Sequence, residues 1–287
     1  MRAVVITGVS TGIGYAATKL FTAEGIKVFG SVRNMSDAKH LQKECGPLYV
    51  PLLFDMTDAE KIKIAAQLVR QQLNGQKLWG LINNAGIFVF GAMMNLPIQD
   101  LRKQLDVNLF GHVMVTQAFI PMLGADKHLT GEPGKIINIS SVAGKNAYPF
   151  MCPYSISKYA MEGFSEGLRR ELMIFGIDVI IVGPGAIKTN IWDKAGNEPM
   201  PPEMENSIYK QPATEFKNYI LCSAEKEALP PENVAALLLT ILRSKHPKVR
   251  YAPIPHKILN WMVFHLLPKR WIDNIIAKKF GLKNSKL

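Results

Sequence analysis

The sequence predicts an α/β fold, in which a doubly wound sheet of seven mainly parallel strands is covered by helices on both faces. Short runs rich in Val, Ile and Leu alternate with longer amphipathic segments, which is the pattern of buried parallel strands joined by helices. The chain has 287 residues, of which 48% are hydrophobic, so it can bury a full-sized core. No internal repeat or low-complexity segment divides it, and we expect one domain over residues 1–254 followed by a tail.

Seven apolar runs have the length and the β-branched composition of buried strands. They cover Ala3 to Thr7, Lys27 to Ser31, Tyr49 to Leu53, Leu78 to Ile82, Lys135 to Ser140, Asp178 to Val182 and Val249 to Ala252. Five segments between them are amphipathic, and several begin near a proline, which fits the first turn of a helix. These predicted helices cover Gly12 to Glu24, Asp58 to Leu73, Pro97 to Leu123, Pro153 to Phe175 and Pro231 to Arg243.

The segment 188–229 differs in composition from the rest of the domain. It is rich in Pro, Asn, Glu and Met, shows no helical period, and follows a strand whose end should face the functional site. A long irregular insert at this place is typical of a lid that covers a substrate. The alternative is a surface excursion without a role.

The tail, residues 255–287, is predicted to be a basic, amphipathic helical extension. From Lys245 to the end of the chain there are ten lysines and arginines and one acid, Asp273, within a formal net charge of +11. One interpretation is a helix that rests on an anionic membrane surface, and the other is a helix packed beside the lid or against a second subunit. Nucleic-acid binding is not expected, because the chain lacks a basic helix face and a motif of stacking aromatic residues.

The three cysteines and the first residues bear on the cellular compartment. Cys45, Cys152 and Cys222 have neither a metal-ligand spacing nor a disulfide framework, so we expect a reducing compartment and no metal site. The first strand is predicted to begin at Ala3, so we expect no removable signal ahead of the fold. No apolar stretch reaches the roughly 18 residues of a membrane-spanning helix. We expect a cytoplasmic protein, with peripheral membrane contact through the tail as the alternative.

A glycine-rich loop joins the first strand to the first helix. Glycine at this place allows a tight turn, a close approach of the backbone to a pyrophosphate, and packing of the helix on the strand. The predicted nucleotide-binding residues of this loop are Gly8, Ser10, Thr11, Gly12, Ile13 and Gly14. A plain strand-to-helix turn is the alternative.

The end of the second strand indicates the type of dinucleotide. A site for NAD(H) places a carboxylate there for the ribose hydroxyls, whereas a 2′-phosphate favours a guanidinium. Val32 stands where the acid would be and Arg33 follows it, so we predict NADP(H) and keep NAD(H) as the alternative. Thr11 occupies the position of a second basic residue that many NADP(H)-binding loops carry.

A tyrosine and a lysine, Tyr154 and Lys158, stand four residues apart near the start of a predicted helix and therefore share one face. The phenol has an ordinary pKa of about 10, and a nearby ammonium would favour its phenolate. Two serines, Ser140 and Ser141, end the preceding strand, fourteen and thirteen residues before the tyrosine. Taken alone, a Tyr and Lys pair of this kind is commonly incidental.

These motifs together resemble the short-chain dehydrogenases/reductases, which have a Rossmann-type fold. Thr7-Gly8-Val9-Ser10-Thr11-Gly12-Ile13-Gly14 is similar to the family's T-G-x-x-x-G-I-G, and Tyr154 to Lys158 to its Y-x-x-x-K. Further matches occur in order along about two thirds of the chain. They are Asp55 and Met56, Asn83 to Gly86, Asn108, Ser141, and Pro184 to Thr189.

The resemblance implies a hydride transfer between a nicotinamide and an alcohol or ketone. It implies that Ser141 positions the substrate oxygen, that Tyr154 transfers the proton, and that Lys158 binds the ribose and biases Tyr154 toward the phenolate. Asn108 would hold a water of the proton relay, although a lone helical Asn is more often a surface amide, and Ser140 would be structural. Cofactor contacts are implied for Asp55, Met56, Asn83, Ala85, Gly86, Pro184, Gly185, Ile187 and Thr189, besides Tyr154 and Lys158.

The helix after Pro153 is similar to that of retinol dehydrogenases, 17β-hydroxysteroid dehydrogenases and 3-hydroxybutyrate dehydrogenase. The predicted substrate-binding residues beside Ser141 are apolar, which favours a steroid, retinoid or other lipid with an alcohol or carbonyl group. They are Phe88, Phe90, Met93, Tyr148, Met151 and Trp192. A dehydrogenase of a small hydroxy acid is the alternative substrate class, and several of these residues are equally compatible with plain core.

Two rival functions and the assembly complete the predictions. A nucleotide-binding regulatory protein without turnover would be expected to lack the tyrosine, the lysine or the serine, all of which this chain has. An epimerase of the extended type would have a shorter glycine loop than this chain. Family resemblance implies a homodimer or homotetramer formed through the helices Pro97 to Leu123 and Pro153 to Phe175.

Overall fold

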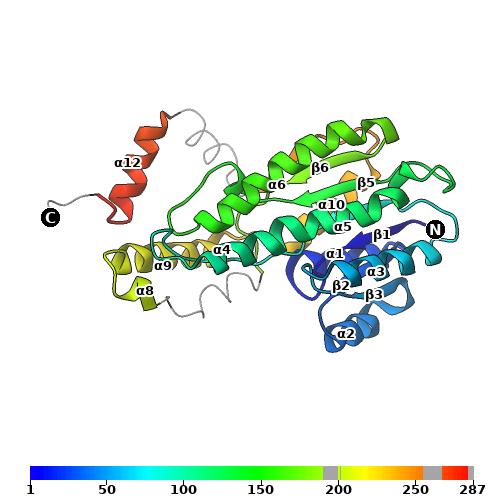
Figure 1. Ribbon diagram of the computed structural model, residues 1–287, viewed down its shortest axis with the longest axis horizontal. Helices are drawn as coiled ribbons and strands as arrows, with labels where there is room; N and C mark the ends of the chain where they lie inside the picture. Colours follow the sequence, from blue (N-terminus) through cyan, green and yellow to red (C-terminus); the bar gives the residue numbers. More distant parts are fainter. Residues whose placement is uncertain (190–199, 201, 255–266, 284–287) are drawn as a thin grey trace.

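The computed structural model describes residues 1–189, 200, 202–254 and 267–283. Seven strands form one sheet in the order β3-β2-β1-β4-β5-β6-β7, and all six pairings are parallel (Figure 1). The strands are β1 Ala3–Ile6, β2 Lys27–Val32, β3 Tyr49–Leu53, β4 Gly80–Asn83, β5 Lys135–Ile139, β6 Asp178–Val182 and β7 Arg250–Tyr251. The predicted fold class is confirmed.

The α-helices are α1 Gly12–Ala23, α2 Met35–Cys45, α3 Ala59–Gln72, α4 Ile98–Leu105, α5 Gly111–Ile120, α6 Cys152–Glu171, α8 Pro202–Glu205, α9 Lys210–Glu227, α10 Pro231–Arg243 and α12 Lys269–Lys279. Short helical turns join or extend them: η1 Gly46–Leu48, η2 Asp106–Phe110, η3 Pro121–Ala125, η4 Val142–Gly144 and η5 Leu172–Phe175. All five predicted helices are present. Three helices that the sequence pattern did not predict, α2, α8 and α9, are present as well.

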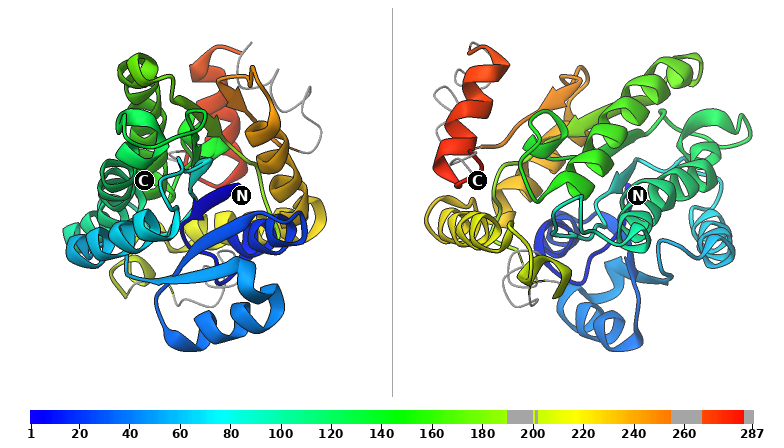
Figure 2. Two further views of the ribbon diagram at one scale, coloured as in Figure 1. Left: turned by 90° about the vertical axis from the view of Figure 1, so that its right-hand side faces the viewer. Right: turned by 60° about the vertical axis from the view of Figure 1, so that its left-hand side comes forward.

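Both faces of the sheet are covered, because side chains alternate along each strand. In β1, Val4 and Ile6 belong to one core cluster with residues of α1, α2 and α10. Ala3 and Val5 belong to a second cluster with residues of α3, α5 and α6. Figure 2 shows the two helical layers from the side. Because the helices cover the two faces of the sheet and not the ends of its strands, the carboxyl ends of the strands form an open edge.

The long apolar helix over Ile98–Ala125 runs through α4, η2, α5 and η3. By length and composition it is the one helix in the described part of the chain that could cross a membrane. In the fold it packs on the sheet, because Val115 and Phe119 are fully buried in the second core cluster. The two π-type turns, η2 and η3, interrupt its regular hydrogen bonds.

The prediction of an irregular segment over 188–229 is wrong for its second half, where α9 runs for 18 residues. Its buried face is a short stripe of small or isolated side chains, including Ala213 and Phe216, among many polar ones. A stripe of this kind is too sparse to give a period on its own. The part of the predicted lid at 190–199 and 201 lies outside the described residues.

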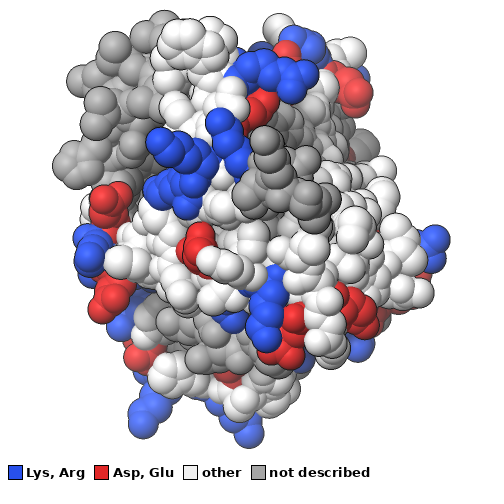
Figure 3. Space-filling model, turned by 90° about the vertical axis from the view of Figure 1, so that its left-hand side faces the viewer, with Lys and Arg blue, Asp and Glu red and all other residues white. Residues whose placement is uncertain are grey.

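The tail forms α12, as predicted, and α12 lies at the end of the molecule opposite the N-terminus (Figure 1). It packs on α9, because the ring of Phe280, just after α12, lies 5.0 Å from the ring of Phe216 in an edge contact. Phe280 is buried, whereas Trp271 is 63% exposed. Figure 3 views this face, where Lys and Arg side chains stand beside large uncharged areas. The predicted tail residues 255–266 lie outside the described part of the chain.

Candidate active site

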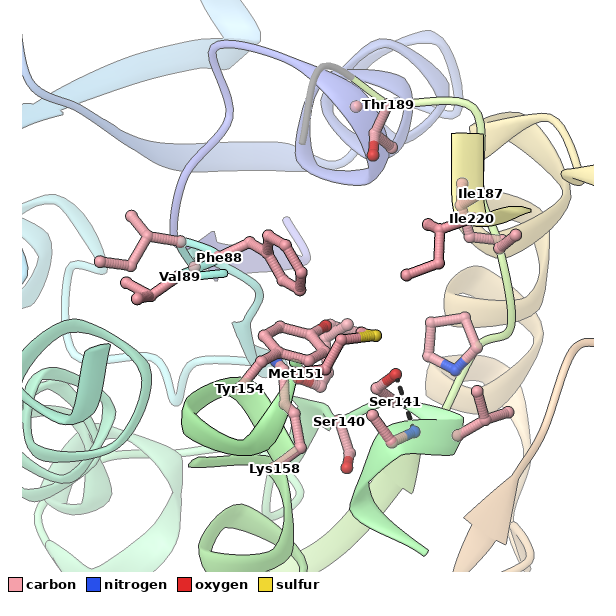
Figure 4. A pocket seen from close by; sticks show the side chains of 18 of the residues that line it. Phe88, Val89, Ser140, Ser141, Met151, Tyr154, Lys158, Ile187, Thr189 and Ile220 are labelled. Carbon is pink, nitrogen blue, oxygen red and sulfur yellow. Dashed lines mark hydrogen bonds between the residues drawn. The ribbon is translucent and has the colours of Figure 1, made fainter. Parts of the chain in front are cut away.

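A cavity of about 1300 Å³ lies at the carboxyl ends of the strands (Figure 4). Its lining residues come mainly from the loops after β1 to β6, from helices α6, α9 and α12, and from β7 and the residues after it. Open parallel sheets bind ligands at this edge. The predicted nucleotide loop and the predicted Tyr and Lys pair therefore face one common space.

The glycine loop is shaped by contacts that leave no room for side chains. A Cβ on Gly8, whose φ is +70°, would lie 2.9 Å from the Cα of Ala85. One on Gly14 would lie 2.3 Å from the carbonyl oxygen of Gly8, and one on Gly12 would lie 2.9 Å from Thr189. Gly8, Ser10, Thr11, Gly12 and Ile13 line the cavity, while Gly14 packs behind them.

This loop fits the pyrophosphate of a dinucleotide. The first N–H groups of α1, from Gly12 onward, have no partner within the helix and stand at the positive end of its dipole. Close approach of the backbone is possible because the glycines place no side chain between it and the cavity. The Gly8 N–H donates to the hydroxyl of buried Ser31 at 2.9 Å, which fixes the loop to β2.

Thr7 and Asn84 tie the end of β1 to the end of β4. The Thr7 hydroxyl accepts hydrogen bonds from the N–H groups of Asn84 and Ala85, at 2.9 and 3.0 Å. The Asn84 amide donates to the carbonyl oxygens of Thr7 and Gly8. Ala85 and Gly86 line the cavity as predicted.

Asn83 is not a lining residue, unlike its neighbours. Its side chain is buried inside the fold and donates to Thr116 and to Asn138, at 2.9 and 2.8 Å. Side chains alternate along β4, so Asn83 points into the helix layer when Asn84 points to the cavity. Asn83 therefore links the end of β4 to the neighbouring strand β5 and to α5.

Arg33 follows β2, is exposed, and lines the cavity. Val32, which stands where NAD-specific sites carry an acid, is buried. Asp55 and Met56 line the same region after β3, and the Asp55 carboxylate accepts hydrogen bonds from the N–H and hydroxyl of Thr57. The end of β2 therefore offers the Arg33 guanidinium, with Val32 at the position where NAD-specific sites carry an acid.

Tyr154, Lys158 and Ser141 line the cavity from α6 and from the end of β5. The Lys158 ammonium donates to the carbonyl oxygen of Ile139 at 2.8 Å and lies 5.5 Å from the centre of the Tyr154 ring. The Ser141 hydroxyl accepts from the N–H of Ala143 at 3.1 Å, which fixes it at the start of η4. Figure 4 shows the three side chains on the same side of the cavity.

Burial sets the protonation of this group. It raises the pKa of Tyr154 to about 12, against the opposite effect of the Ser141 hydroxyl. It lowers the pKa of Lys158 to about 8, against the opposite effect of the Glu162 carboxylate. The expected bias of Tyr154 toward the phenolate is therefore not produced by the protein's own groups, because burial outweighs the neighbouring ammonium. At neutral pH the phenol carries its proton and the lysine its charge.

Asn108 is fully buried, so the alternative of a surface amide is excluded. It lies in the π-type turn η2, accepts from the N–H of Ile87 at 2.8 Å, and donates to the Ile87 carbonyl oxygen and to Ser157. These bonds join the long helix to the loop after β4 and to α6. Ser140 is also buried, and its hydroxyl has no hydrogen-bond partner among the described residues.

The loop after β6 closes the far side of the cavity. Pro184, Gly185, Ile187 and Thr189 all line it, as predicted. The Pro184 carbonyl oxygen accepts from the N–H of Val142 at 3.0 Å, which joins this loop to the turn that follows Ser141.

The predicted apolar wall is present in part. Phe88, Phe90, Tyr148 and Met151 line the cavity, and the Phe88 ring meets the Tyr154 ring edge-on at 5.3 Å. Met93, predicted to bind substrate, is instead 44% exposed and is not among the residues that line the cavity, whereas its neighbour Ala92 is buried. Trp192 lies outside the described residues.

Many lining residues were not predicted, and one group of them comes from α9 and from the region of α12. Phe216, Ile220, Ile276 and Phe280 extend the aromatic wall away from Tyr154. No motif marks them, because only tertiary packing brings these helices to the cavity. Asn84 and Ser31 also line it, and the Asn-Asn-Ala-Gly run was the one sequence signal that pointed to the first of them.

The model of the short chain dehydrogenase family matches residues 2–199, more than half of the chain. The chain is a short-chain dehydrogenase. It is 39% identical over 280 residues to an NADPH-dependent 3-dehydrocapnine reductase of Ornithobacterium rhinotracheale, covering 97% of both chains. It is 34% identical to dehydrogenase/reductase SDR family member 9 of Bos taurus, over 96% of this chain and 87% of that one.

Solved structures share the fold. A short-chain dehydrogenase from Streptomyces avermitilis superposes with a TM-score of 0.75 at 24% identity, covering 99% of this chain and 98% of the other. This short-chain dehydrogenase is therefore an oxidoreductase of the family that acts on CH–OH groups and the corresponding carbonyls.

Proposed function

We propose that this short-chain dehydrogenase uses NADPH to reduce a ketone or aldehyde group on a hydrophobic molecule. The observation that carries the proposal is the placement of Tyr154, Ser141 and Lys158 together at one end of an aromatic cavity, where burial raises the pKa of the Tyr154 phenol to about 12. A phenol that holds its proton at neutral pH is suited to give it to an alkoxide as that forms. The phenol is therefore suited to act as the acid in the reductive direction.

The roles of the residues follow from their positions. NADPH, when bound, supplies the hydride. Ser141 donates a hydrogen bond to the carbonyl oxygen, and Tyr154 transfers its proton to that oxygen. Lys158 holds the ribose, and Asn108 joins the helices beneath the site. Arg33 faces the 2′-phosphate, which agrees with the cofactor that the 39% identical relative's name gives.

An apolar substrate is supported by the wall that runs from Phe88 to Phe280. Relatives differ in the compounds that their names give: a 3-dehydrocapnine reductase, a 3-amino-tetrahydro-pyrrolizinone reductase and a retinol dehydrogenase. A lipid with a carbonyl group fits the wall better than a small hydroxy acid does, because a small acid would leave most of the aromatic surface without contact.

The test is NADPH oxidation, followed by absorbance, with a panel of steroid, retinoid and long-chain ketones and aldehydes. Tyr154→Phe should lower kcat by a factor of at least about 1000 and leave the Kd for NADPH within about twofold, because only the proton donor is lost. Tyr159→Phe, on the same helix but exposed, is the matched control. Substantial turnover by Tyr154→Phe, or a clear preference of the wild type for NADH, would contradict the proposal.

Two further features of the proposed enzyme concern its surroundings. We place it in the cytoplasm with α12 resting on an anionic membrane surface, because Trp271 and Ile275 are exposed on a helix rich in Lys and Arg. We also propose a homodimer or homotetramer, because apolar side chains are exposed on η2 and α6.

A further inference from the structure

An acidic side chain is buried beside Lys158. Glu162 lies one helical turn further along α6, and 6% of its side chain is exposed. Arg250, from the edge strand β7, binds it with both Nε and Nη2: Nε lies 3.2 and 3.0 Å from the two carboxylate oxygens, and Nη2 lies 3.1 Å from Oε1. Lys145, just after η4, lies 3.3 Å from Oε2. A carboxylate buried to this degree is stable only when it is paired in this way.

Two glycines make the space for this ion pair. A Cβ on Gly183, just after β6, would lie 2.4 Å from the Nη2 of Arg250. A Cβ on Gly144, the last residue of η4, would lie 2.7 Å from the Ser140 hydroxyl and 3.1 Å from the Cγ of Glu162. The carboxylate is therefore packed directly beneath the turn that begins at Ser141, and it joins that turn to α6 and to β7.

The charges around Lys158 are unequal. Arg250 and Lys145 add positive charge to its surroundings, and Tyr154 on α6 is neutral at pH 7. His112, which faces Lys158 from α5, is also neutral, because burial lowers its pKa to about 3. Among the described residues, Glu162 is the one acid that acts on Lys158.

We propose that Glu162 is a positioning residue that keeps the ammonium of Lys158 charged and, through Arg250 and Lys145, holds the Ser141 turn against α6. The proposal rests on the proposed function, in which a charged Lys158 binds the cofactor. Its physical basis is that Glu162 stands one helical turn beyond Lys158 on α6 and that its negative charge, together with the hydrogen bond to the Ile139 carbonyl oxygen, opposes the effect of burial on the ammonium. Arg250 weakens the effect of Glu162 on Lys158, because its guanidinium neutralises part of the charge of the Glu162 carboxylate.

The first experiment titrates Lys158 in the cofactor-free protein, by NMR of ¹³C-methylated lysines. Glu162→Gln should move the titration of Lys158 to lower pH than in the wild type. Arg250→Gln should move it to higher pH, because the carboxylate then acts with less compensation. Glu166→Gln is the matched control: Glu166 lies one turn further along α6, is exposed, and pairs with Arg170. A merely structural role would shift the Lys158 titration in neither variant, or in the same direction in both. Opposite shifts in the two variants would therefore indicate an electrostatic role.

The second experiment measures turnover against pH. In Glu162→Gln, KM for NADPH should rise as the pH increases from about 6 to about 9, by roughly tenfold more than in the wild type, while kcat at about pH 6 changes little. Glu162→Asp should restore most of the wild-type profile. If Glu162→Gln does not fold, Arg250→Gln and Glu162→Asp still give the titration.

An unmoved Lys158 titration in Glu162→Gln, or in the folded Arg250→Gln variant, overturns the proposal. The NMR result does not depend on turnover. If no carbonyl compound is reduced but the titrations shift in opposite directions, the proposed function fails and the role of Glu162 stands.

Discussion

His112 is a buried base without charge, and it lies beneath the loop that follows β4. Its Nε2 lies 2.7 Å from the carbonyl oxygen of Ala85, and its Nδ1 is buried without a hydrogen-bond partner among the described residues. Burial, with a smaller contribution from the charge of Lys158, lowers its pKa to about 3 from an ordinary value of 6.5. His112 is therefore harder to protonate in the folded protein than in the unfolded chain.

This difference makes stability depend on pH, with a definite sign. Above pH 6.5 neither state protonates His112, and the contribution to stability is complete. Below it the unfolded chain binds the proton first, so the free energy of unfolding should fall by up to about 1.4 kcal/mol per pH unit until about pH 3.

His112→Gln should remove this component, so the change in the free energy of unfolding between about pH 7 and about pH 5 should be smaller by roughly 2 kcal/mol. Urea unfolding at the two pH values measures it. The exposed His40→Gln is the control, and equal pH dependence in both variants would contradict the expectation.

The glycine loop gives a second prediction at the scale of residues. In Gly14→Ala the new methyl group would meet the carbonyl oxygen of Gly8, which belongs to the backbone and cannot turn away. The variant should lose roughly 1 to 3 kcal/mol of stability and bind NADPH at least about tenfold more weakly. Gly163→Ala, in the open on α6, should instead gain about 0.5 to 1 kcal/mol. Urea unfolding and a fluorescence titration with NADPH measure both, and equal effects of the two changes would be inconsistent with the packing described.

Much of the candidate site could be predicted because its residues have fixed spacings along the chain. Gly8 to Gly14, and Tyr154 to Lys158, are local patterns whose geometry follows from one turn or one helical repeat. Asn83 was misplaced because a pattern of four residues does not say which side chains of a strand end face the cavity. Met93 was misplaced because apolar character does not distinguish a side chain of the cavity wall from an exposed one.

At the scale of elements, the central strands were predictable because each is a β-branched run buried on both faces. α2 was not, because Ala38 and Leu41 are its only buried residues and the rest is polar. α9 has a similarly sparse stripe. Such helices depend on contacts with distant parts of the chain. Their own sequences therefore show no clear amphipathic period from which the helix could be predicted.

α12 gives a prediction at this scale. Phe280 fixes it to α9, and Trp271, which does not line the cavity and is 63% exposed, is free to enter a lipid headgroup layer beside Lys and Arg. Trp271→Glu should reduce flotation with vesicles of phosphatidylserine and phosphatidylcholine by at least about fivefold. Met173→Glu, exposed on η5, is the control. Equal flotation of wild type and Trp271→Glu would contradict a membrane contact through α12.

At the scale of the whole molecule, the exposed apolar side chains on η2 and α6 bear on assembly. Phe110 is 54% exposed, and Ile156 and Tyr159 on α6 are 37% and 46% exposed. Burying such side chains between subunits stabilises an oligomer by about 25 cal/mol for each Å² of apolar surface.

Phe110→Glu should therefore shift the protein to monomers, because the carboxylate would have to be buried at the contact. Light scattering after gel filtration, at several protein concentrations, measures the mass. Ile64→Glu, on α3 and 63% exposed, should leave the mass unchanged. A monomeric wild type, or loss of assembly in Ile64→Glu, would contradict this placement of the interface.

One cavity reaches from the hydroxyl of Tyr154 to the ring of Phe280, and this continuity has a consequence for selectivity. In the proposed function the reacting group of a substrate is held at one end, and the rest of the molecule would extend along the rings toward α12. The enzyme should then select substrates by the length of the chain attached to the carbonyl group more than by the chemical groups next to it. Within a homologous series of ketones, kcat/KM should climb with each added methylene until the chain spans the aromatic wall, and level off beyond it.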